Sequence, residues 1–166
     1  MPSAFLWLML VPSSLRLPAP VNQGVRLNLQ QPRQQTKAMF AYDPNKQPES
    51  KAWLDLPEAE RMAAVERHHK AARIKLPNAR GHAAFHVMVE NQIADGYDPT
   101  IRAIARLVQE GLTRHDAVHA IGSAISEQLF EAMKAEQPDA PEVTQAMISA
   151  AIERLSAKDW LQQFKR

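Results

Sequence analysis

Two pairs of histidines with a spacing of four residues constrain this chain more than any other feature of its sequence. His82 and His86 form the first pair, and His115 and His119 form the second. Because an α-helix turns once every 3.6 residues, both rings of each pair lie on one side of a helix, about 6 Å apart along its axis. Each pair also shares its stripe with apolar residues, so we expect two helices whose histidines face the protein interior.

The chain from residue 57 onwards repeats this helical spacing of apolar residues and is interrupted by proline and glycine. Gly96 and Gly111 end two of the periodic segments, as glycines that follow a helix commonly do. No segment alternates apolar and polar residues as a half-buried strand does. The expected fold is therefore all-α, a compact bundle of four to five helices. The predicted helices cover residues 57–75, 82–96, 98–111, 113–136 and 141–157, with a last turn at 160–164.

Two finer predictions concern the helix over residues 98–111 and the helix that follows it. Ile101, Ile104 and Val108 recur at helical spacing, and we expect this stripe to face the core. Thr113 and Asp116 have the spacing of a capping box, in which the threonine hydroxyl accepts a hydrogen bond from the backbone NH three residues later. We therefore expect the next helix to start at this threonine.

Residues 1–38 differ in composition from the rest of the chain. They contain no acidic residue, are rich in proline and glutamine, and show no periodicity, so we expect a disordered tail. The change in composition supports the hypothesis that the native protein starts at Met39, which would make this tail an over-extended start. Residues 39–56 contain two prolines and are expected to form an irregular arm anchored by Trp53. The helical bundle domain then covers residues 57–166.

Charge and composition argue against several classes of function. Of the 20 basic residues, 16 follow residue 38, together with all 18 acidic residues, so this part of the chain carries a net charge of −2. A nucleic-acid partner is therefore not expected. The apolar run at residues 4–11 is too short to span a membrane and lacks the basic flank of a signal peptide. We expect a cytoplasmic protein with no membrane partner, which forms a homo-oligomer or acts alone.

Seven side chains make up the predicted metal site. The first histidine pair continues one helical turn further to Glu90, and upstream Glu66 and His69 share a helix face. Because the chain has no cysteine, histidine and carboxylate side chains are its only strong ligands for a divalent transition metal such as zinc, iron or manganese. The set suits one ion or a two-ion centre. The predicted ligands are Glu66, His69, His82, His86, Glu90, His115 and His119.

The chemistry of such a site stays open at this stage. Neither histidine pair encloses the glutamate base of a zinc peptidase, because the intervening residues are AAF and DAV. A catalytic site would activate water for hydrolysis, or use oxygen if iron is bound, on a small-molecule substrate that the sequence does not identify. The alternative is a non-enzymatic helical interaction module in which the histidines form a buried hydrogen-bond network with Glu66, Glu90 and Asn91. Arg102, Arg106 and Arg114 are expected on a solvated edge.

Three segments resemble a known bacterial family. They are YDPNKQPESKAW at residues 42–53, NARGHAAFHVMVENQ at 78–92 and GLTRHDAVHAIGSAISEQLFE at 111–131. Together they are similar, over about residues 40–134, to the domain-of-unknown-function family numbered 1841. The resemblance implies a small helical protein with recurring histidines and no established activity. A weaker likeness to histidine-ligated helix bundles such as the hemerythrins rests on the set of metal ligands alone.

Overall fold

The computed structural model describes residues 39–134 and 140–163, and these ranges contain seven helices and no strand. The predicted all-α class is confirmed. The helices are α2 (Ser50–Leu54), α3 (Glu58–Ala71), α4 (Ala79–Ala94), α5 (Asp98–Gln109), α6 (Arg114–Lys134), α7 (Pro141–Arg154) and α8 (Ala157–Gln162). The predicted disordered tail, residues 1–38, lies outside the described residues.

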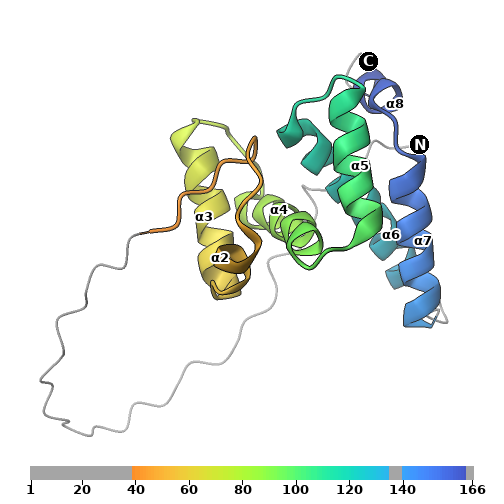
Figure 1. The fold of residues 1–166 in the computed structure, drawn as a ribbon, viewed down its shortest axis with the longest axis horizontal. Helices are drawn as coiled ribbons and strands as arrows, with labels where there is room; N and C mark the ends of the chain where they lie inside the picture. The colour runs from red at the N-terminus through yellow and green to blue at the C-terminus, as the bar shows by residue number, and fades with distance from the viewer. Residues whose placement is uncertain (1–38, 135–139, 164–166) are drawn as a thin grey trace, which may run out of the picture.

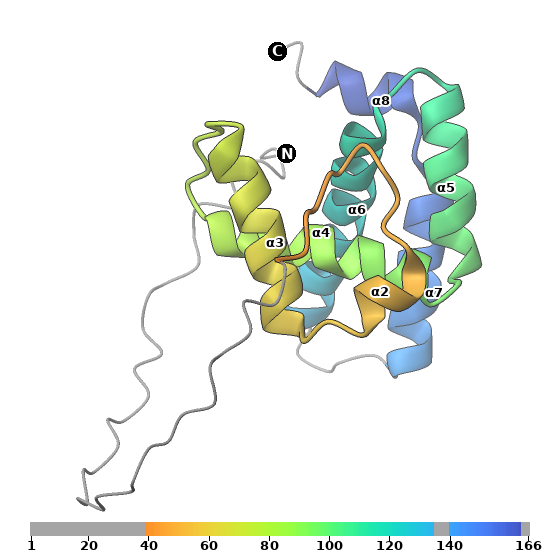
Figure 2. The same cartoon turned by 60° about the vertical axis from the view of Figure 1, so that its left-hand side comes forward.

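Helix α4 lies at the centre of the bundle. It packs against α2, α3, α5 and α6, while α6 also packs against α5 and α7. Figure 1 shows α2 and α3 on one side of α4, with α5, α7 and α8 on the other, and Figure 2 shows α4 running between α3 and α5. Because α3 and α6 both pack against α4, the three helices that carry the predicted metal ligands are held side by side.

Most helix ends follow the signals in the sequence. Gly96 and Gly111 come just after α4 and α5 with φ angles of 79° and 105°, a region that glycine adopts without steric cost. The backbone NH of Asp116 donates to Thr113 Oγ1 at 3.0 Å, which confirms the predicted cap at the start of α6. Helix α4 starts about one turn earlier than predicted, because the side chain of Asn78 caps it.

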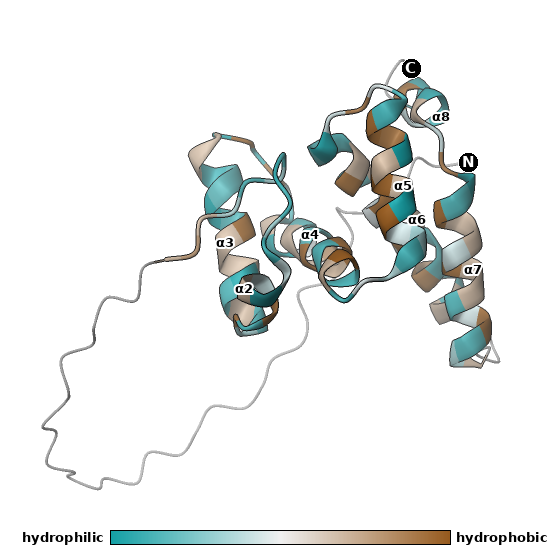
Figure 3. Ribbon diagram, viewed as in Figure 1, coloured by the Kyte–Doolittle hydropathy of each residue, from teal (hydrophilic) through white to brown (hydrophobic). Residues whose placement is uncertain are grey.

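The structure corrects the predicted inner face of α5. Ile101 and Val108 are 41% and 43% exposed, whereas Thr100, Ala103 and Leu107 are buried. The apolar residues of this helix, seen as brown bands along α5 in Figure 3, form an arc wider than one stripe, from Ala103 through Ile104 to Ala105, so the spacing alone does not decide which part of the arc faces the core. Packing against α4 and α6 selects the face with Thr100, whose hydroxyl donates to Gln92 of α4 at 2.6 Å.

The arm before the bundle contains helix α2, although we expected residues 39–56 to be irregular. The carboxylate of Glu49 accepts hydrogen bonds from the backbone NH groups of Lys51 and Ala52 and so caps this short helix. Trp53 anchors the arm as expected, because its ring is fully buried and its Nε1 donates to Asn91 Oδ1 at 2.9 Å. The arm is therefore fixed on α4, close to the histidines.

Gly122 sets how closely α6 approaches α4. A Cβ atom at this position would lie 3.2 Å from the Cβ of Phe85, the residue before His86. We therefore expect Gly122→Val to overpack this contact and to lower the free energy of unfolding by about 1–3 kcal/mol, measured by urea denaturation. The matched control is Ser123→Val, which adds a β-branched side chain at the next, partly exposed position. An equal loss in both variants would contradict the close approach.

Candidate metal centre

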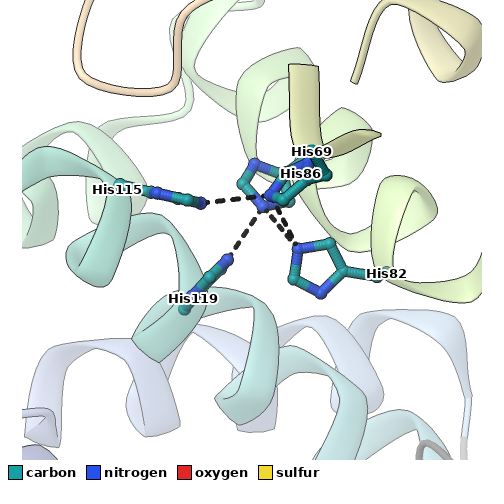
Figure 4. A group of neighbouring side chains, drawn as sticks. All are labelled: His69, His82, His86, His115 and His119. Carbon is teal, nitrogen blue, oxygen red and sulfur yellow. Dashed lines mark hydrogen bonds between the residues drawn. The ribbon is translucent and has the colours of Figure 1, made fainter. Parts of the chain in front are cut away.

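Five of the seven predicted ligands come together between three helices. His69 lies in the last turn of α3, His82 and His86 lie on α4, and His115 and His119 lie on α6. Figure 4 shows their rings pointing toward one another. One ring nitrogen from each of these five side chains, called the five-histidine cluster below, lies within 4.8 Å of the corresponding nitrogen of every other. The spacing of four residues placed each pair on one face, and packing against α4 brought the pairs together.

The contacts inside the five-histidine cluster all join Nε2 atoms. The separations are 3.1 Å between His69 and His82, 3.1 Å between His82 and His86, 2.9 Å between His86 and His119, and 3.3 Å between His69 and His115. His69 and His86 are buried, whereas the other three rings are partly exposed. The five nitrogens thus face one small volume between α3, α4 and α6.

The opposite nitrogens of two rings determine which tautomer they adopt. His69 Nδ1 lies 2.9 Å from the carbonyl of Val65, which can only accept, so this Nδ1 carries the proton. Tyr42 donates its single hydroxyl proton to Glu90 at 2.8 Å, so its oxygen accepts from His86 Nδ1 at 3.0 Å. A neutral His69 and a neutral His86 therefore each direct an unprotonated Nε2 into the cluster.

Hydrogen bonds alone satisfy this arrangement poorly. The Nε2 atoms of His69 and His86 each have one lone pair in the ring plane, yet each lies within hydrogen-bond distance of two other Nε2 atoms. At most two of the four contacts can therefore be well-aligned N–H···N bonds. A cation at the centre can accept the lone pairs of all five neutral rings at once.

Glu90 lies at the edge of the cluster, and its carboxylate is bound to other groups. Arg114 donates to both of its oxygens, at 2.8 and 2.7 Å, and Tyr42 donates to Oε1. The carboxylate is 1% exposed, and the guanidinium also reaches the carbonyl of Pro44 at 2.8 Å. The structure therefore places Glu90 in a buried ion pair with Arg114, next to the ring of His86 rather than among the clustered nitrogens.

Three other polar side chains considered from the sequence also lie outside the cluster. Glu66 is partly exposed on α3, and its carboxylate does not belong to the group of clustered ligand atoms. His68, the sixth histidine, packs its ring against those of Tyr42 and His115 without joining the cluster. Asn91 accepts hydrogen bonds from Trp53 and from Arg61, so it anchors the arm.

Sequence reasoning missed Tyr42 and Arg114. The prediction that Arg114 lies on a solvated edge was wrong, because its side chain is only 11% exposed and pairs with Glu90. Tyr42 is 44 residues before His86, so no helical spacing connects the two. The available signals were indirect: Tyr42 opens the first family-like segment, and Arg114 directly precedes a predicted ligand.

Burial keeps the clustered histidines neutral. Burial, together with a smaller effect of neighbouring histidines, lowers the pKa of His82 and of His115 to about 4 and that of His119 to about 3. Burial also lowers the pKa of His69 and of His86 from the usual 6.5. At neutral pH each of the five rings is therefore neutral and has one nitrogen with a free lone pair, which is the state that metal binding requires.

No family model, no curated protein and no solved structure matches this chain, so its resemblance to the family numbered 1841 and its likeness to histidine-ligated bundles remain predictions from the motifs. The helices in the described ranges are all too short or too polar to cross a membrane. The function must therefore be argued from the geometry and charge of the cluster itself.

The lowered pKa values predict acid sensitivity of the metal-free protein. Between pH 6.5 and about 4 the unfolded chain binds more protons at these histidines than the folded protein does, so the free energy of unfolding falls as pH falls through this window. We expect a loss of about 1 kcal/mol or more per histidine, measured by urea denaturation at several pH values. The pH dependence should be shallower for His115→Gln. Stability that is unchanged or higher near the acid end of the window would contradict the prediction.

The ion pair between Glu90 and Arg114 predicts that removing one charge destabilises the protein and that removing the other charge as well restores part of the stability. Glu90→Gln leaves the largely buried guanidinium without its counter-charge, so we expect the free energy of unfolding to fall by about 3–5 kcal/mol. The double variant Glu90→Gln, Arg114→Met removes both charges and should recover part of this loss. A double variant no more stable than Glu90→Gln alone would show that the pair does not behave as a buried ion pair.

Proposed function

We propose that this protein binds one divalent transition-metal ion through the Nε2 atoms of the five-histidine cluster. The observation that carries the proposal is the convergence of five ring nitrogens within 4.8 Å of one another, two of them unprotonated at Nε2 because of their other hydrogen bonds. A separate cost supports it, since buried lone pairs that face each other without protons are destabilising. An ion removes that cost and joins α3, α4 and α6.

One ion fits the cluster better than two. Two-ion centres place their ions about 3.5–4 Å apart and in helix bundles share carboxylate ligands between them. The described residues provide no carboxylate among the clustered ligand atoms. Glu90, the acidic group on the same helix face as His86, is already bound by Arg114 and Tyr42. Two divalent ions would therefore face each other with only neutral ligands around them.

The number and spacing of the ligands favour an ion that accepts five or six of them. Ligands at right angles around an ion with bonds of about 2.1 Å lie about 3.0 Å apart, and tetrahedral ligands lie about 3.4 Å apart. The four contacts in the cluster range from 2.9 to 3.3 Å. Iron, nickel and copper combine imidazole affinity with higher coordination numbers, whereas structural zinc sites are nearly always four-coordinate. We therefore propose an ion of the iron, nickel and copper group, with one further position open.

Glu90, Tyr42 and Arg114 orient the cluster in this proposal and do not bind the ion. Tyr42 links the Glu90 carboxylate to His86 Nδ1, which fixes the ring and directs its Nε2 inward. Burial raises the pKa of Tyr42, so the phenol stays a hydrogen-bond donor. Arg114 balances the charge of Glu90, so this carboxylate can lie buried beside the site.

The surroundings favour small-molecule binding or redox chemistry over hydrolysis. Hydrolysis commonly uses a carboxylate or a histidine as a general base beside the reacting water. Here the five clustered histidines are proposed ligands, and the nearby Glu90 is neutralised by Arg114. When bound, an ion of this group supplies Lewis acidity and, for iron or copper, one-electron redox chemistry at a position that a small molecule can reach.

The alternative function is an interaction module in which the histidines form only a hydrogen-bond network. The contacts between Nε2 atoms favour it, because protons on His82, His115 and His119 would face the lone pairs of the other two rings. It explains the geometry less well, since two lone pairs must serve four contacts. The cytoplasmic location and self-association expected from the sequence stay predictions under either function.

Metal analysis of the full chain tests the proposal. We expect one equivalent of metal per chain after purification without chelator or after loading with iron(II), nickel(II) or copper(II). An ion bound only to the folded state stabilises it by mass action, so chelation should lower the melting temperature. The free energy of unfolding should fall by about 2.7 kcal/mol where free metal was present at a hundred times its dissociation constant. His86→Ala and the more exposed His115→Ala should each bind the ion at least about tenfold more weakly, because each removes one of the five proposed ligands.

The matched control is His68→Ala, which removes the one described histidine that lies outside the cluster. It should keep one equivalent of metal. Binding that is lost equally in His68→Ala would point to general histidine affinity. A wild-type protein that takes up no metal and melts identically with and without chelator would favour the hydrogen-bond network.

A further inference from the structure

We infer that the open position of the proposed centre binds a small anion rather than a neutral molecule. This inference rests on the proposed function and adds the chemical class of the ligand. It follows from the balance of charge around the five-histidine cluster, since a partly buried ion whose charge is not offset costs free energy.

The proposed ligands leave the full charge of the ion uncompensated. An imidazole binds a metal through an unprotonated nitrogen, so each of the five rings contributes no charge. The described residues place no carboxylate among the clustered ligand atoms. A divalent ion would therefore keep a charge of about +2 at a position where two of the rings, His69 and His86, are 2% and 0% exposed.

The acidic groups near the cluster are already paired or face solvent. Glu90 is bound at both oxygens by Arg114, so this pair contributes no net charge. Asp43 and Asp116 lie within electrostatic reach of His115. Both are partly exposed, and Asp43 forms an ion pair with Lys46 at 3.3 Å. These two side chains reduce the local charge without providing an atom in the cluster.

The stretch of chain around the segment that connects α3 to α4 is basic. It joins His69 to His82, whose Nε2 atoms are 3.1 Å apart, so both of its ends meet the cluster. No acidic residue occurs between Glu66 and Glu90. Four cations in this stretch are exposed, and none forms an ion pair with a described residue. They are Lys70, Arg73, Lys75 and Arg80. These four cations, called the basic edge below, are close in sequence to His69 and His82.

The test uses the full chain loaded with cobalt(II), whose visible absorption reports its ligands, and two linear probes of similar size. Sodium azide is the anion, and acetonitrile is the neutral molecule. We expect azide to change the spectrum saturably and to bind at least about tenfold more tightly than acetonitrile. Equal affinities, or no spectral response to azide, would overturn the inference. A chain that takes up neither cobalt(II) nor iron(II), nickel(II) or copper(II) would instead overturn the proposed metal centre.

A pair of variants isolates the charge. His119→Glu puts a carboxylate into the ligand set and should lower azide affinity at least about tenfold while one cobalt per chain is retained, because the ion's charge is then partly offset. His119→Gln changes the same proposed ligand without adding a charge, so the two variants are compared with each other at saturating cobalt, and His119→Gln should bind azide at least about tenfold more tightly than His119→Glu. Equal azide affinities in the two variants would overturn the charge argument.

The basic edge has its own control. Arg73→Gln combined with Lys75→Gln should weaken azide binding about two- to fivefold and make it less sensitive to salt. Lys51→Gln removes an exposed lysine on α2 that is paired with Asp55, and it should leave azide binding unchanged. Equal azide affinities in the double variant and the wild type would remove the role assigned to the segment between α3 and α4.

Discussion

The buried ion pair between Glu90 and Arg114 is the interaction on which the candidate site depends. It joins the middle of α4 to the first residue of α6, and through Pro44 and Tyr42 it also holds the arm. A charge at 1% exposure persists only when it is paired. Because Tyr42 bridges the carboxylate to His86, this pair also determines which nitrogen of that ring faces the other four.

The cluster is held in a state suited to binding before any ion arrives. The carbonyl of Val65 and the hydroxyl of Tyr42 accept hydrogen bonds from the Nδ1–H groups of His69 and His86, and burial keeps the clustered rings neutral. The folded protein thereby keeps lone pairs in mutual contact that would be better solvated in water. If the cluster binds an ion as proposed, such preorganisation would lower the stability of the metal-free fold and raise the affinity for the ion by a corresponding amount.

Much of the fold and of the ligand set could be predicted because helical spacing is a local property. The two histidine pairs, the glycines that end α4 and α5, and the cap at Thr113 all follow from residues at most four positions apart. The face of α5 could not be predicted, since its apolar residues fit more than one stripe and contact with α4 and α6 chose between them. Glu90 shares the stripe of His86, so spacing alone could not separate a ligand from an orienting group.

The sequence by itself determined that the protein is helical, that its histidines lie in pairs on apolar faces, and that imidazole and carboxylate are its available metal ligands. Only the tertiary structure decided that five imidazoles meet while both predicted carboxylates stay outside. The physical reason is distance along the chain. Arg114 lies 24 residues from Glu90, and Tyr42 lies 48 residues before it, so the competition for that carboxylate arises only when α4, α6 and the arm pack together.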